Sequence, residues 1–219
     1  MLRLENLSKS YWYKGVRRTI ISNLNLTLPP GRSMALLGGN GAGKTTLLEI
    51  IAGVQKPDTG RVVTDGSVSW PVGFSGSFNG DMTGRQNTIF VARVYGIDTR
   101  SLLRFVSDFA ELGVQFDAPV RTYSSGMKAR LSFGLSMGIQ FDTYLVDETT
   151  AVGDARFNLK SRAVFRERIR NASAIMVSHQ TRKVKDYCDA ALVLHQGRLE
   201  YFDDLEEGVA YHEALMARA

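Results

Sequence analysis

Short apolar runs, strand-like alternations and amphipathic stretches follow one another along this chain. Apolar and polar residues alternate, as in strands, over Leu2–Leu7 and Ile21–Leu28. Ser33–Leu37 is a short apolar run typical of a strand that is buried on both faces. Lys44–Ala52 has the pattern of a helix, which Gly53 ends. The first part of the chain therefore predicts strands that lead into a helix.

The same alternation returns in the second half of the chain. We expect strands at Tyr144–Val146, Ala174–Val177 and Ala190–Leu194, and a helix with an arginine-rich outer face over Phe157–Ile169. Strands that alternate with helices along a chain usually pair in parallel. The expected fold class is therefore α/β with a parallel sheet.

Two stretches between these regions have a different pattern. Residues 66–82 are rich in glycine and only weakly periodic, so we expect a long loop, which in a compact domain is usually functional. Residues 84–139 have helical apolar spacing, for example at Leu102, Phe105 and Phe109. We interpret this helical stretch as an insertion into the α/β core.

Composition narrows the class of protein only slightly. The 219 residues are 44% apolar and 22% charged, near the averages for soluble globular proteins. The net charge of +5 suits anionic ligands or an anionic membrane face, but equally an ordinary protein with dispersed charge. Cys188 is the single cysteine, so no intrachain disulfide is expected. No stretch approaches the apolar length that spans a bilayer, so we expect a cytosolic chain whose membrane role depends on a partner.

A glycine-rich segment between the apolar run and the helix carries the clearest chemistry. Gly38–Thr45 fits the phosphate-loop pattern G-x-x-x-x-G-K-[ST] without departure. Its glycines let the backbone wrap phosphates, and the successive N–H groups at a helix start attract negative charge. We expect Lys44 to reach the β- and γ-phosphates of a nucleotide and the Thr45 hydroxyl to bind Mg²⁺. The expected nucleotide-binding residues are Gly38, Asn40, Gly41, Ala42, Gly43, Lys44, Thr45 and Thr46.

Acidic and histidine side chains follow two later strands, at the edge of a parallel sheet where ligands bind. Asp147 is placed to hold Mg²⁺, and Glu148 to polarise the water that attacks the γ-phosphate. The alternative is a strand that ends in a solvated acidic turn. His179 follows another apolar strand and could contact the γ-phosphate, although a lone histidine is more often structural or at the surface. The expected catalytic residues are Glu148, His179 and Lys44.

A serine–glycine segment makes the pattern more specific. Thr122–Met127 precedes a helical stretch and lies about twenty residues before Asp147. The order of the glycine loop, this segment, Asp147-Glu148 and His179 resembles that of ABC transporter ATPases. Their signature usually reads Leu-Ser-Gly-Gly-Gln, so Tyr123, Ser125 and Met127 depart from it, and a serine helix cap is the alternative. The resemblance implies one ABC-type ATP-binding domain over 1–219, with a P-loop NTPase (RecA-like) core, an N-terminal antiparallel β subdomain and an inserted α-helical subdomain. The core and β subdomain would span about 1–82 and 140–219, and the helical subdomain about 83–139.

The family resemblance also implies an assembly. It predicts a head-to-tail homodimer with two ATPs at its interface, each bound by Ser124, Ser125, Gly126 and Met127 of the other copy. Asp154 matches the aspartate of the family's D-loop. Tyr11 resembles the aromatic residue that stacks on adenine, although Tyr13 or Trp12 could serve instead and any of them could pack within a strand. The glutamine of the family's Q-loop has no counterpart within residues 70–80.

Further segments narrow the resemblance to one kind of exporter. Trp70–Gly73, Thr83–Arg85, Ala151–Asp154 and the form of Thr122–Met127 resemble the ATPases of Gram-negative capsule-polysaccharide exporters of the polysialic acid type. This implies an ATP hydrolase at the cytoplasmic face of the inner membrane that drives capsular polysaccharide export. Its partners would be integral membrane permease subunits and, through them, periplasmic and outer-membrane export proteins, with no nucleic acid. The alternatives are export of O-antigen or teichoic acid, a soluble ABC ATPase of DNA repair or translation, or a P-loop GTPase or kinase.

Overall fold

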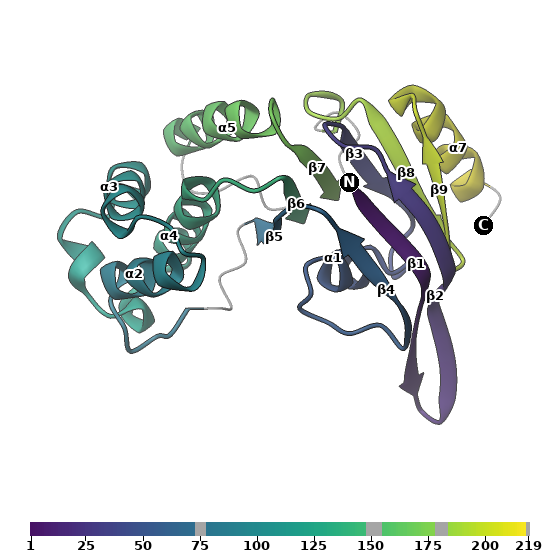
Figure 1. Ribbon diagram of the computed structural model, residues 1–219, viewed down its shortest axis with the longest axis horizontal. Coiled ribbons are helices and arrows are strands. Elements are labelled where there is room, and N and C mark those ends of the chain that lie inside the picture. The colour runs from purple at the N-terminus through teal and green to yellow at the C-terminus, as the bar shows by residue number, and fades with distance from the viewer. Residues whose placement is uncertain (73–77, 148–154, 178–183, 218–219) are drawn as a thin grey trace. The chain divides into compact units, whose positions relative to one another are not determined.

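The computed structural model describes residues 1–72, 78–147, 155–177 and 184–217 (Figure 1). The chain divides into two compact units, which are considered separately below. The sheet unit comprises Met1–Pro71, Phe141–Glu148 and Ile169–Ala219, and the helical unit comprises Val72–Gln140 and Thr149–Arg168. None of the described helices is long and apolar enough to cross a membrane.

A three-stranded antiparallel sheet begins the sheet unit. Its strand order is β2-β1-β4, with β1 at Leu2–Tyr13, β2 at Val16–Leu28 and β4 at Thr59–Thr64. Both early strands are longer than predicted, and β4 was not predicted. The alternation fades near the turn at Lys14 and Gly15, because Trp12, Tyr13 and Val16 are all exposed there. In Figure 1 this hairpin of β1 and β2 extends beyond the end of β4.

The second sheet has six strands in the order β5-β6-β7-β3-β8-β9. Strands β6, β7, β3 and β8 run parallel, as predicted, and β9 pairs antiparallel with β8. Strand β9, which was not predicted, therefore adds an antiparallel edge to the predicted parallel strands. Gln196 and Gly197 both have positive φ and form a two-residue turn, which can join only antiparallel neighbours. The strand bounds are β3 Ser33–Leu37, β5 Val68–Val72, β6 Thr143–Asp147, β7 Ser173–Val177, β8 Ala190–His195 and β9 Arg198–Phe202.

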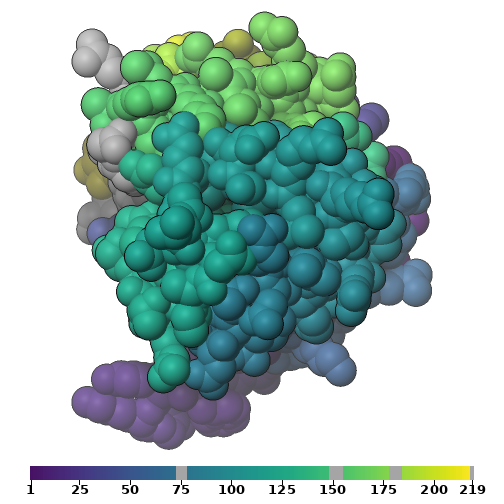
Figure 2. Space-filling model, turned by 90° about the vertical axis from the view of Figure 1, so that its left-hand side faces the viewer, coloured from purple at the N-terminus to yellow at the C-terminus, as the bar shows by residue number. Residues whose placement is uncertain are grey.

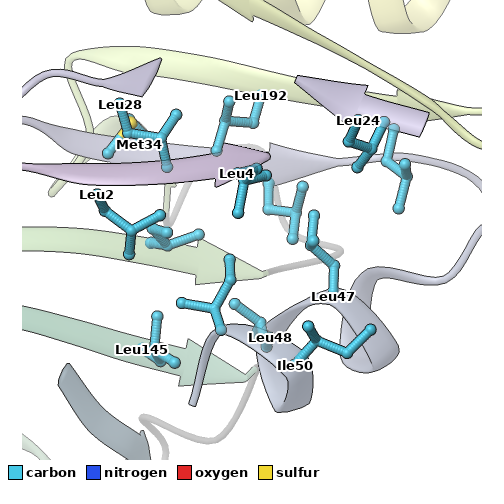
Figure 3. Packing of buried hydrophobic residues seen from close by; sticks show 14 of the residues in the cluster. Leu2, Leu4, Leu24, Leu28, Met34, Leu47, Leu48, Ile50, Leu145 and Leu192 are labelled. Atoms are coloured by element: carbon cyan, nitrogen blue, oxygen red, sulfur yellow. The ribbon is translucent and has the colours of Figure 1, made fainter. Parts of the chain in front are cut away.

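The core of the sheet unit fills the space between the two sheets and helix α1, which spans Lys44–Ile51. All five residues of β3 are buried, which explains why its apolar run predicted the bounds of this strand correctly. Figure 3 shows leucines of β1, β2, β6 and β8 converging with the apolar side of α1. Burial of each such leucine stabilises the fold by about 2 kcal/mol. The core thus fixes both the strand that precedes the glycine loop and the helix that follows it.

Two elements of the sheet unit correct the sequence predictions. Strand β5 lies within the segment predicted to be a long loop, and its Ser69 hydroxyl accepts a hydrogen bond from the Leu145 amide at 2.9 Å. Helix α7, at Leu205–Ala217, was not predicted. It packs closely on β8, since a Cβ added to Gly208 would lie 2.3 Å from the Cβ of Ala191.

The helical unit confirms the predicted helical stretch. Thr83 caps α2 through a capping box with Gln86, and Asp98 caps α3. Phe109 lies at the centre of an aromatic cluster, with ring centroids 5.7 Å from Phe133 and 5.1 Å from Phe157. Figure 2 shows the surface of this unit. Its helices are α2 Gly84–Val94, α3 Thr99–Ala110, α4 Ser125–Gly138 and α5 Ala155–Ile169, with 3-10 segments η2 Gly113–Asp117 and η3 Val120–Thr122.

Candidate active site

The glycine loop joins the buried end of β3 to the start of α1. Its backbone needs glycine at Gly41 and Gly43, where φ is +73° and +104°. A Cβ at Gly43 would lie 2.2 Å from Cγ2 of Ile20, and one at Gly38 would lie 2.5 Å from the carbonyl oxygen of Leu194. The loop is therefore pressed against β2 on one side and β8 on the other. The glycine spacing of the motif has a packing reason as well as a conformational one.

Lys44 places a positive charge inside this loop. Its side chain is buried, and Nζ donates hydrogen bonds to the carbonyl oxygens of Gly38 at 2.8 Å and Gly39 at 3.0 Å. Lys44 is also the first residue of α1, whose backbone N–H groups and dipole favour an anion at this end. The loop therefore concentrates positive potential where a phosphate group can be held.

Two oxygen-bearing side chains meet beside Lys44. Thr45 follows it on α1, and Asp147 is the last residue of β6. The Thr45 hydroxyl donates a hydrogen bond to Oδ2 of Asp147 at 3.3 Å. Hydroxyl and carboxylate oxygens suit Mg²⁺, which protein chains usually hold through one or two ligands while phosphates and waters supply the rest. Among the described residues no group of three or more His, Cys, Asp or Glu gathers.

A pocket of about 290 Å³ opens over the loop. It brings together eight of the residues that the sequence predicted for nucleotide and Mg²⁺ binding. The residues that line it are Tyr11, Ile20, Asn40, Gly41, Gly43, Lys44, Thr45, Thr46, Asp147 and Val177. Gly38 and Ala42 belong to the same loop, and the Ala42 amide donates to the Gly39 carbonyl oxygen at 3.2 Å.

Of the three neighbouring aromatic residues near the hairpin turn, Tyr11 lines this pocket. Its hydroxyl donates to Oε1 of Gln55 at 2.8 Å, and 38% of the residue is exposed. Trp12 and Tyr13 are 74% and 67% exposed and lie nearer the hairpin turn. Trp12 faces the other side of the strand from Tyr11, because side chains alternate. Adenine stacking itself stays a prediction for all three.

Helix α7 lies beside the glycine loop, a contact that the sequence did not predict. The sulfur of Met216 would lie 3.5 Å from a Cβ on Gly39, so the helix ends beside the glycine loop. Burial, followed by the positive charge of Lys44, lowers the pKa of His212 below its usual 6.5. No motif marks these residues, since their position depends on how α7 packs against β8.

The serine–glycine segment lies in the helical unit, at the start of α4. Ser124 is the N-cap of this helix, and its Oγ accepts a hydrogen bond from the Met127 amide at 3.2 Å. Ser124 and Ser125 are exposed. The structure thus confirms the alternative that Ser124 is a helix cap. A phosphate-binding role of the same helix start is compatible with this cap and stays a prediction. Glu148, Asp154 and His179 lie outside the described residues, so their roles stay predictions.

Comparison with known proteins decides the family. The family model described as ABC transporter matches residues 21–151, a span that includes the glycine loop, the start of α4 and Asp147. The chain belongs to the ABC transporter family. This membership confirms the predicted enzyme class, an ABC-type ATP hydrolase.

Several proteins resemble this ABC transporter chain along almost its whole length. The polysialic acid transport ATP-binding protein KpsT of Escherichia coli is 47% identical, with 95% of each chain covered. The capsule polysaccharide export ATP-binding protein CtrD of Neisseria meningitidis serogroup B is 41% identical, with 98% of this chain and 100% of CtrD covered. These relatives confirm the predicted resemblance to capsule exporter ATPases. The O-antigen export ATP-binding protein RfbB of Klebsiella pneumoniae is less similar, at 34% identity over 93% of this chain and 85% of RfbB.

The fold of this ABC transporter chain is also that of solved ATP-binding cassettes. The dimeric cassette MJ0796 bound to ADP and Pi has a TM-score of 0.77 at 19% identity, with 94% of this chain and 99% of that chain covered. The predicted P-loop NTPase core, antiparallel β subdomain and helical insertion are confirmed as a fold class.

Proposed function

We propose that this chain binds and hydrolyses ATP to drive the export of a capsular polysaccharide through a membrane permease. The similarity to KpsT and CtrD carries this proposal, since both are named as transport or export ATP-binding proteins and match nearly end to end. The chain would be a single ATP-binding domain with the helical subdomain at about 83–139. It would work at the cytoplasmic face of the inner membrane, held there by the permease and linked through it to periplasmic and outer-membrane partners.

The pocket over the glycine loop supports the nucleotide part of the proposal. Phosphate oxygens would accept from the Lys44 ammonium and from the N–H groups at the start of α1. Thr45 and Asp147 would hold Mg²⁺, whose charge offsets that of the phosphates when it is bound. Thr46, Asn40 and Tyr11 line the same pocket, and the Tyr11 ring would stack on the base.

Further residues are proposed for hydrolysis and for dimer contact. Glu148 follows Asp147 directly and would orient the attacking water, and His179 would donate to the γ-phosphate. In a head-to-tail dimer the exposed helix start at Ser124 and Ser125, with Gly126 and Met127, would meet the ATP of the other copy, near Asp154. Energy for transport would then come from tighter ATP binding by the closed dimer than by the open one.

Purification from membranes tests the proposal as a whole. The chain, expressed with its chromosomal neighbours, should copurify with a polytopic membrane protein, and the complex should hydrolyse ATP. Lys44→Ala should copurify equally well but lose nucleotide binding, because it removes the buried cation from the loop. A cell that carries Lys44→Ala should retain its capsule polymer inside. Retention of O-antigen or teichoic acid instead would favour the alternative glycan, and a chain that never associates with membranes would refute the transporter role.

A further inference from the structure

The hairpin of β1 and β2 carries a cation to the rim of the nucleotide pocket. Arg18 on β2 is paired with Tyr11 on β1. A Cβ built on Gly41 would lie 4.0 Å from Nη2 of Arg18. Gly41 belongs to the glycine loop and lines the pocket, so the guanidinium reaches the backbone that is proposed to wrap the phosphates.

A second residue of β2 approaches the same glycine loop. Ile20, two residues along β2, meets the same loop, where a Cβ on Gly43 would lie 2.2 Å from its Cγ2. The two separations show that Arg18 and Ile20 both approach the glycine loop. Arg17 is paired with Trp12 and therefore lies on the opposite face.

The charge of Arg18 has no carboxylate to neutralise it within the described part of the chain. Arg32 and Arg85, in contrast, make ion pairs of 2.6 Å with Asp189 and Asp117. Arg18 is also exposed, so its charge can be offered to a ligand. A guanidinium presents several N–H donors in a plane, which suits phosphate oxygens.

We propose that Arg18 is a further nucleotide-binding residue, which donates hydrogen bonds to the phosphate groups of the ATP held by the glycine loop of its own chain. This inference rests on the proposed function, since it requires ATP in the pocket. The two residues of this cross-strand pair would then contact different parts of the nucleotide. Tyr11 would contact the base, and Arg18 would contact the phosphates. The hairpin is thereby a second contact for the nucleotide, in addition to the glycine loop.

Arg18→Gln and Arg17→Gln are a matched pair, because both residues are exposed, adjacent and equally charged but face opposite sides of β2. Binding of ATP, ADP and adenosine to each full-length variant is measured by calorimetry or NMR titration. Arg18→Gln should weaken ATP binding about tenfold, the range for a lost charge-assisted hydrogen bond, and leave adenosine binding unchanged. Arg17→Gln should bind all three ligands as the unaltered chain does, and Arg18→Lys should recover part of the ATP affinity.

Two results would overturn the inference and leave the proposed function intact. One is equal ATP affinity in Arg18→Gln and Arg17→Gln. The other is a loss of adenosine binding as large as the loss of ATP binding, which would mean that Arg18 supports the fold of the hairpin or the base site. Failure of the unaltered chain to bind ATP would instead overturn the proposed function, and this inference with it.

Discussion

The Thr45 hydroxyl donates to the Asp147 carboxylate at 3.3 Å, although the two residues are 102 positions apart in the sequence. Thr45 comes from the start of α1 and Asp147 from the end of β6. The contact joins the phosphate-binding loop to the acidic strand end without any contribution from the helical unit. Thr45 and Asp147 are also the two residues that are proposed to bind Mg²⁺.

Replacement of Asp147 by asparagine should raise the Mg²⁺ requirement of the ATPase. The amide keeps the size of the side chain but loses the charge that holds a divalent cation. We expect the Mg²⁺ concentration for half-maximal hydrolysis to rise about tenfold, while Mg²⁺-free ATP binding changes little. Asp142→Asn, just before the other end of β6, is the control and should keep the original Mg²⁺ dependence. Identical Mg²⁺ titrations for the two variants would remove Asp147 from the metal site.

Glu148→Gln should separate ATP binding from ATP hydrolysis. The amide cannot accept a proton from the attacking water, so single-turnover hydrolysis should slow by about 100-fold or more. ATP affinity, measured by equilibrium binding, should stay near that of the unaltered chain. Near-normal turnover would show that another group activates the water.

Two adjacent glycines of the loop should respond differently to alanine. At Gly38 the new Cβ would lie 2.5 Å from the Leu194 carbonyl oxygen, a backbone atom that cannot move without disturbing β8. At Gly39 the nearest atom would be the Met216 sulfur at 3.5 Å, an ordinary contact. Urea unfolding should show a loss of about 2 to 4 kcal/mol for Gly38→Ala and of less than about 1 kcal/mol for Gly39→Ala. Equal unfolding midpoints would contradict the packing described for this loop.

His212 should make the stability of the sheet unit depend on pH. Its pKa is lowered first by burial and then by the charge of Lys44, with a small further effect from His195 and an opposing one from Glu213. The unfolded chain takes up this proton near pH 6.5 and the folded chain only at lower pH. Stability from this group is therefore complete above pH 6.5 and falls as the pH drops through the lowered pKa. Urea unfolding between about pH 5 and pH 7 should show a shallower pH dependence in His212→Gln. An unchanged slope would mean that His212 does not titrate differently on folding.

The sequence predicted best those elements that are buried on both sides. Strand β3 was correct to the residue because each of its residues is buried and every one after Ser33 is apolar. Strand β5 was missed because it is short and half-buried and contains Trp70-Pro71 beside a glycine-rich stretch. Strand β9 was also missed. Its antiparallel direction depends on the turn at Gln196 and Gly197.

The residues of the candidate site likewise include some that the sequence predicted and one that it did not. Lys44, Thr45 and Asp147 could be predicted, because motif spacing and the shared edge of parallel strands bring them to one pocket. Arg18 could not, since its neighbours in the loop depend on which face of β2 is turned toward Gly41. A sequence pattern reports alternation along a strand, but only the register with the partner strand decides what each face meets.

The division of the chain into two units has a consequence for how this ATP hydrolase can change over evolution. Every described residue that lines the phosphate pocket belongs to the sheet unit, and the exposed helix start at Ser124 belongs to the helical unit. Substitutions on the surface of α2 or α3, in the helical unit, would therefore change no residue that lines this pocket. Such surface changes can accumulate in a lineage while the residues of the pocket are inherited unaltered.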